Sequence, residues 1–195
     1  MTGVDGASAT DTHLVASARA GNQSAYTALL QRHREAMFRL ARGHTGGDAD
    51  AALDIVQETF VAAFAALHRY DTARPFRVWL SRIALNKCRD RARRRTVRRF
   101  FSFARPLEEA VDAPDAAPGP EAAARSAQEV RRIERAIANL PDMLKNVLLL
   151  RTIEELSQAE TAQALGITEK AVETRLYRAR RKLSAALRDD AAPRV

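Results

Sequence analysis

The 195-residue sequence predicts an all-α protein built from two small helical domains joined by a flexible linker. Two observations support this fold class. The strongly patterned segments repeat their apolar residues with the period of a helix, and no run alternates apolar and polar residues as a half-buried strand does. Between residues 96 and 125 the composition changes to proline, glycine and acidic residues, which disfavour a packed core. The expected limits are 1–95 for the first domain, 96–125 for the linker, 126–189 for the second domain and 190–195 for a tail.

Four helices are expected in the first domain. Their ranges are 11–20, 24–41, 48–67 and a fourth that begins near Pro75 and continues into an arginine-rich run. Proline suits the first turn of a helix, and Gly46 and Gly47 indicate the loop before the third helix. That third helix is expected to turn one apolar face inward, formed by Leu53, Val56, Phe60, Phe64 and Leu67.

The second domain is expected to begin with a capping box of Ser126 and Glu129, followed by a helix to residue 139. The pair Leu140-Pro141 then breaks the chain, and a short apolar helix covers residues 143–150. Two further helices follow, so this domain also has enough helical segments to close a small core.

Residues 157–187 have the pattern of a helix-turn-helix. Ser157 and Glu160 form a second capping box, Gly166 supplies the turn, and Thr168 can cap the next helix. The inner stripe of that helix is Val172, Leu176, Ala179, Leu183 and Leu187. Its outer residues are Lys170, Glu173, Thr174, Tyr177, Arg178 and Arg181. A helix of this kind can enter a major groove; the alternative is a helical hairpin with solvated arginines.

The charge balance favours a polyanionic partner such as nucleic acid. Net charge is +8, and eight basic residues against one acidic residue gather between residues 86 and 99. A single cysteine, Cys88, excludes an internal disulfide and fits a reducing, cytoplasmic environment. The longest apolar run, residues 60–67, is far shorter than the ~20 residues that span a membrane, and the N-terminus has no signal-peptide pattern.

Catalytic, cofactor and metal motifs are not found in the sequence. The four histidines, His13, His33, His44 and His68, have no ligand-like spacing, so we expect no metal site. There is no phosphate-binding loop, nucleophile elbow or paired-histidine motif. We therefore expect neither an enzyme nor a cofactor nor a small-molecule substrate.

A polar stripe runs along the fourth expected helix. Trp79, Arg82, Asn86, Arg89 and Arg93 recur at spacings of 3, 4, 3 and 4, which places them on one side. Arginine and asparagine there suit contacts with phosphates and base edges. Trp79 can stack on an unpaired base, although core packing is the commoner use of a large aromatic residue. For the arginines the alternative is a solvated face, disfavoured by mutual repulsion.

The third expected helix carries a different surface. Asp54, Gln57, Glu58 and Val61 lie beside its apolar face. An acidic and apolar surface in a basic protein is poorly suited to DNA and better suited to a protein partner. A plain solvated face is the alternative.

Taken together, these segments resemble the extracytoplasmic-function group of bacterial sigma-70 family factors. The resemblance rests on DIVQETFVAAF (residues 54–64), RPFRVWLSRIALNKCRD (residues 74–90), the Leu140-Pro141 pair and residues 157–183. It implies a promoter-specificity subunit with sigma domain 2, a linker and sigma domain 4. The implied partners are core RNA polymerase, promoter DNA at the −10 and −35 elements, and an anti-sigma factor, often anchored in a membrane, that responds to stress.

The resemblance also implies roles for particular residues. Core polymerase binding falls on Asp54, Gln57, Glu58 and Phe60. Recognition and melting of the −10 element falls on the loop and helix from His68 to Arg93, including Trp79, Arg82, Asn86, Lys87, Arg89 and Arg93, with residues 69–76 as the loop that takes up a flipped base. The −35 major groove faces Lys170, Glu173, Thr174, Tyr177 and Arg178. Glu173 stands where a basic residue is common; a carboxylate can accept a hydrogen bond from cytosine N4.

Two other functions remain open from the sequence. An autonomous helix-turn-helix regulator could use residues 157–187, but it would need a sensor domain at its N-terminus, and no strand pattern indicates one. An RNA-binding structural protein could use the arginine run, but would not need the helix-turn-helix. The acidic linker side chains between Glu108 and Glu121 are expected either to mimic RNA in the polymerase exit path or to act as a soluble tether.

Overall fold

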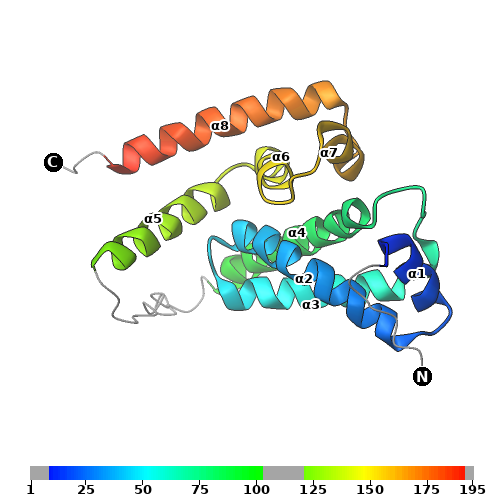
Figure 1. The fold of residues 1–195 in the computed structure, drawn as a ribbon. Helices are drawn as coiled ribbons and strands as arrows, with labels where there is room; N and C mark the ends of the chain where they lie inside the picture. The colour runs from blue at the N-terminus through cyan, green and yellow to red at the C-terminus, as the bar shows by residue number, and fades with distance from the viewer. Residues whose placement is uncertain (1–8, 103–120, 192–195) are drawn as a thin grey trace.

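The first half of the chain forms a bundle of helices (Figure 1). The computed structural model describes residues 9–102 and 121–191. Its first domain consists of α1 (Asp11–Arg19), α2 (Gln23–Thr45), α3 (Ala49–Ala65), a 3-10 turn (Leu67–Arg69) and α4 (Phe76–Ser102). Helix α2 packs against α1, α3 and α4, and α3 packs against α4. The four helices therefore share one core.

The second half contains α5 (Glu121–Ala138), α6 (Asp142–Thr152), α7 (Gln158–Leu165) and α8 (Glu169–Ala191). Helix α8 contacts α5, α6 and α7, so it is the central element of this domain. Figure 1 shows α5 and α8 side by side, with α6 and α7 facing the first domain. The described residues contain helices and no strand, which confirms the predicted all-α class.

Side-chain caps explain where several helices begin. The carboxylate of Asp48 accepts the backbone N–H of Ala51 at 2.9 Å at the start of α3. Ser157 and Glu160 form the predicted reciprocal capping box of α7. Gly166, with φ 65°, ends α7 in the left-handed conformation that glycine adopts at little cost. These local signals lie within a few residues of the helix ends, which is why the sequence predicts them well.

Three expectations about the helices are wrong. Helix α5 begins at Glu121, so Ser126 lies inside it and caps nothing; the preceding residues, EAAAR, are good helix formers and extend the helix backward. Helix α4 continues to Ser102, so the segment expected as linker is helical at both ends. Leu53 is 52 % exposed rather than inward, because the buried face of α3 is centred on Ala52, Ile55 and Phe60. The acidic segment expected to mimic RNA lies, apart from Glu121 at the start of α5, within residues 103–120, which are outside the part of the chain that the structure describes.

The two domains pack directly against each other. Helix α4 contacts α7, and α2 contacts α5 and α6. Leu149, Leu150 and Leu156 of the second domain belong to the same buried cluster as Leu40 and Leu80 of the first. Within the described ranges, no helix is long and apolar enough to cross a bilayer. The same ranges contain no group of three or more His, Cys, Asp or Glu residues placed to hold a metal ion.

Candidate nucleic-acid and polymerase interfaces

Helix α4 carries an exposed polar stripe, the α4 stripe, formed by Arg82, Asn86, Arg89 and Arg93. The inner side of the same helix is held by buried Leu80, Ala84 and Leu85. Asn86 Oδ1 accepts a hydrogen bond from the Arg89 guanidinium at 3.3 Å. Four side chains predicted to contact DNA are thus brought together on one helix face, where cationic and amide groups can reach phosphates and base edges.

Two of the other residues expected at the −10 element lie elsewhere. Trp79 is half-buried, and its ring packs 5.0 Å from Tyr70 and 5.5 Å from Phe76, measured between centroids. Lys87 turns toward α3, with its ammonium 3.9 Å from the Glu58 carboxylate. Trp79 therefore serves first as part of an aromatic cluster that supports the start of α4, with only its outer part open to a base.

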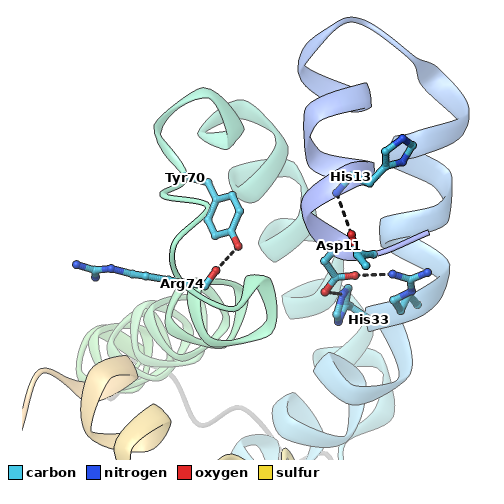
Figure 2. A network of polar contacts seen from close by, with 7 residues as sticks. Asp11, His13, His33, Tyr70 and Arg74 are labelled. Carbon is cyan, nitrogen blue, oxygen red and sulfur yellow. Dashed lines mark hydrogen bonds and ion pairs between the residues drawn. The ribbon is translucent and has the colours of Figure 1, made fainter. Parts of the chain in front are cut away.

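The loop between the 3-10 turn and α4 is fixed by one arginine of α1. The Arg19 guanidinium donates to the carbonyl of Leu67 at 3.1 and 2.9 Å and also to the carbonyl of Tyr70. The Tyr70 hydroxyl donates to the carbonyl of Arg74, whose side chain points away from Tyr70 (Figure 2) and lies 3.3 Å from the Asp71 carboxylate. Burial raises the pKa of Tyr70, as do the charges of Asp11 and Asp71, so its hydroxyl remains a donor. These hydrogen bonds hold the backbone of this loop, which the resemblance predicts to take up a flipped base.

A carboxylate clamp ties α1 to α2 beside this loop. Asp11 accepts from the Arg32 guanidinium at 2.7 Å and lies 2.9 Å from His33 Nε2 (Figure 2). Burial alone would raise the pKa of Asp11, but the hydrogen bonds from His33 and Arg32 outweigh it and lower that pKa below its usual value. The His33 ring packs 5.2 Å from Phe76 at the start of α4.

Sequence reasoning did not single out Arg19, Asp11 or Tyr70. Arg19 occupies the last turn of α1, where a basic residue has an ordinary explanation in the helix dipole. Its carbonyl partners lie 48 and 51 residues away along the chain. No spacing pattern predicts contacts at that distance.

Helix α3 exposes Asp54, Gln57 and Val61 of the expected protein-binding surface. Leu53, which is predicted to face inward, is exposed beside them, and these four residues form the α3 face. Leu53 is 52 % and Val61 66 % exposed, so two apolar side chains are exposed to solvent beside the polar side chains of this face. Asp54 pairs with Arg91 at 3.2 Å, and Glu58 beside this face lies 3.6 Å from Arg94. Phe60, by contrast, is 3 % exposed and lies in the core. A direct partner contact by Phe60 is therefore not available in this structure.

Helix α8 exposes the residues predicted for the major groove, the α8 face: Lys170, Glu173, Thr174, Tyr177 and Arg178. Val172 and Ala179 on its opposite side are buried. Tyr177 is 62 % exposed, with the Arg181 guanidinium 5.8 Å from its ring centroid. Lys170 and Glu173 form an ion pair of 2.9 Å across one turn. The Gln158 amide donates to the Glu169 carbonyl at 3.0 Å and fixes how α7 meets α8.

Comparisons with known proteins agree with this arrangement. Residues 29–98 match the family Sigma-70 region 2, and residues 130–183 match Sigma-70, region 4. RNA polymerase sigma factor CnrH of Cupriavidus metallidurans is 43 % identical over 183 residues, which cover 92 % of this chain and 95 % of that protein. ECF RNA polymerase sigma factor SigW of Bacillus subtilis is 31 % identical over 173 residues, covering 87 % of this chain and 92 % of that protein.

A solved structure of CnrH in complex with the cytosolic domain of CnrY superposes on this chain with a TM-score of 0.69 and 38 % identity, covering 92 % of this chain and 98 % of that one. The chain thus belongs to the sigma-70 family of RNA polymerase sigma factors, in its extracytoplasmic-function group. The predicted resemblance is confirmed, and with it the function of directing promoter-specific transcription initiation.

Proposed function

We propose that this sigma factor divides its work among the three surfaces described above. The α3 face binds core RNA polymerase, the α4 stripe binds the −10 element, and the α8 face reads the −35 element. The observation that carries this proposal is that α4 and α8 each bury one side and leave a polar, largely basic side exposed. The division into two helical domains is part of the proposal, with the linker expected at 96–125 shortened by α4 and α5, which extend into it from both ends.

The α3 face suits a protein partner because it combines exposed apolar and acidic side chains. Leu53 and Val61 supply apolar area that water does not favour, and Asp54 adds a charge that can pair with a basic partner residue. Arg91 of α4 currently holds Asp54, so binding exchanges one pairing for another. Gln57, an uncharged polar residue, lies between Leu53 and Val61 along α3.

At the −10 element the factor makes and breaks no covalent bonds; the core polymerase catalyses RNA synthesis. Unstacking one base costs a few kcal/mol, and a stacked aromatic contact returns about 1–3 kcal/mol per base. The loop over residues 69–76, fixed by Arg19, would receive the base, with the open part of Trp79 beside it. The α4 stripe would then hold the released strand through its guanidinium groups.

Control by an anti-sigma factor is the second element of the proposal. CnrH, which shares 38 % identity with this chain over nearly its whole length, was solved in complex with the cytosolic domain of CnrY. By analogy, this chain would be held by an anti-sigma protein anchored in a membrane and released on stress, and it would act in the cytoplasm. Affinity capture with the purified product of an adjacent gene tests the partnership, and recovery of the factor is the expected result.

The decisive experiment for the function mixes the purified chain with core RNA polymerase. We expect co-elution and transcription from a dedicated promoter that core polymerase alone does not use. An autonomous helix-turn-helix regulator would instead bind duplex DNA unaided and would not co-elute. That second result would overturn the proposal.

A further inference from the structure

Helix α1 lies outside the residues that the Sigma-70 region 2 family matches. That match covers residues 29–98, whereas α1 spans Asp11–Arg19. The helix packs against α2 and the 3-10 turn. Its last residue, Arg19, directs its guanidinium to the loop that the resemblance assigns to base capture. The family match therefore gives no role to the helix that holds this loop.

Arg19 holds the loop where the loop leaves the 3-10 turn. Its Nε and Nη2 atoms donate to the Leu67 carbonyl at 3.1 and 2.9 Å, and Nη2 also donates to the Tyr70 carbonyl. At Tyr70 the turn ends and the chain becomes extended, with φ −68° and ψ 127°. A guanidinium presents its N–H groups in one rigid plane, so binding both carbonyls fixes the direction in which the loop departs.

Tyr70 extends this restraint to the far end of the loop. Its hydroxyl donates to the Arg74 carbonyl (Figure 2). Its ring is 4 % exposed and lies 5.4 Å, between centroids, from Phe76 at the start of α4. The Arg19 guanidinium also lies 6.0 Å from the centroid of the Tyr70 ring. One connected set of contacts that begins in α1 therefore holds the loop backbone at both ends.

The outer surface of the loop is left open by these contacts. Residues 71–75 are all exposed, so the restraint acts on the backbone and leaves their side chains accessible. An unrestrained loop would have to become ordered when the base arrives, at a cost in conformational entropy. A loop that is ordered beforehand binds the base without that cost.

We propose, on the basis of the proposed role of the loop over residues 69–76, that Arg19 is a positioning residue for base capture. Its guanidinium keeps the loop in the conformation that receives the unpaired −10 base. Without the guanidinium the loop leaves that conformation, and the affinity for the base falls with the fraction of molecules that remain competent. Binding to core polymerase and to the −35 element is unchanged, because the α3 face and the α8 face lie on other helices.

The test uses holoenzyme assembled from core polymerase and the full chain, with promoter DNA whose −10 non-template strand is unpaired. Fluorescence anisotropy measures the affinity for this DNA and for DNAs in which one −10 base at a time is replaced by an abasic residue. The position at which wild type loses most affinity identifies the captured base. We expect wild type to lose several-fold there and Arg19→Gln to lose little, because the variant has already lost its contact with that base.

Two further variants separate positioning from charge. Arg34→Gln removes the same charge from an exposed position of α2 and should keep the full abasic penalty. Arg19→Lys keeps the charge without the planar guanidinium, so it should behave like Arg19→Gln. If Arg19→Gln weakened binding equally on intact and abasic DNA, or if Arg19→Lys matched wild type, the positioning role would be overturned in favour of a simple charge effect.

Tyr70→Phe gives a second test that does not depend on how Arg19→Gln folds. It keeps the ring in the aromatic cluster, removes the hydroxyl that donates to Arg74, and should also reduce the abasic penalty. Circular dichroism checks that helix content is unchanged in each variant. A wild-type penalty in both Arg19→Gln and Tyr70→Phe would overturn the inference. If wild type itself showed no penalty at any position, the proposed base capture would fail instead, so the two failures are distinguishable.

Discussion

Ser157 and Glu160 hold each other at the start of α7: the Ser157 hydroxyl accepts the Glu160 backbone N–H at 3.1 Å, and the Glu160 carboxylate accepts the Ser157 N–H at 2.7 Å. We expect Ser157→Ala to lower the free energy of unfolding by about 1 kcal/mol, the usual value of such a cap. Urea denaturation followed by circular dichroism measures it. Ser184→Ala, at an exposed position within α8, should leave stability within about 0.5 kcal/mol of wild type.

Acidification should weaken the fold through His44. Burial lowers the pKa of His44 from 6.5 to about 4, and the neighbouring charge of Lys145 acts in the same direction; Arg89 also lowers it, while Asp142 opposes them. The folded state therefore favours neutral His44, whereas the unfolded chain takes up a proton below pH 6.5. Stability is full above pH 6.5 and falls as the pH drops toward 4, by at most about 3 kcal/mol.

Urea midpoints at pH 7.5 and pH 5 test this expectation. His44→Gln should flatten the pH dependence between these values, whereas His13→Gln, at an exposed histidine, should not. An equally steep loss of stability in His44→Gln would show that another group is responsible.

The α3 face can be tested by placing a charge on it. We expect Val61→Asp to weaken binding to core polymerase at least about tenfold, since a buried interface position tolerates an unpaired charge poorly. Val130→Asp is the matched control, because Val130 is a similarly exposed valine, 49 % against 66 % for Val61, on α5. Equal polymerase affinities for the two variants, measured by fluorescence titration, would remove the α3 face from the interface.

The α4 stripe should account for part of the salt dependence of promoter binding. For a holoenzyme that neutralises about six phosphates, the logarithm of affinity falls with the logarithm of salt with a slope near −5. Arg89→Ala and Arg93→Ala should each reduce that slope by about 1. Gel-shift titrations at several salt concentrations measure the slope. The control is Arg34→Ala, a substitution at an exposed arginine of α2. An unchanged slope in both stripe variants would contradict the assignment.

Glu173 should set sequence preference more than affinity. Its carboxylate is held 2.9 Å from Lys170 at the exposed start of α8, where it can accept from cytosine N4. We expect Glu173→Gln to change the preferred base at one −35 position by about 1–3 kcal/mol of discrimination. Selection from a library randomised at the −35 element measures this. If the selected sequences were identical for variant and wild type, Glu173 would have no role in base reading.

Local features of the fold could be predicted from the sequence, and contacts between distant segments could not. The Ser157 cap and the Gly166 turn depend on residues three to four positions apart, and both are confirmed. The predicted start of α5 is wrong because the helix-forming residues before Ser126 extend the helix back to Glu121. The predicted inward position of Leu53 is wrong because a helical period tolerates a shift of one position.

For the candidate interfaces, too, local features could be predicted from the sequence and contacts between distant segments could not. The exposed residues of the α4 stripe and the α8 face follow from helical spacing alone. The half-burial of Trp79 and the Arg19 bonds depend on how helices cross, which spacing does not encode. The packing of the two domains against each other is not predicted for this reason, since the spacing of Leu149 and Leu150 fits the core of a separate domain equally well.

The unbroken length of α4 has a mechanical consequence. At about 1.5 Å per residue, its 27 residues make a stiff rod of about 40 Å. Arg77, which pairs with Glu160, lies at one end of this rod beside the loop over residues 69–76, and the arginines of the α4 stripe follow along the helix. Because the guanidinium groups share this rod, any tilt of α4 displaces the whole row together.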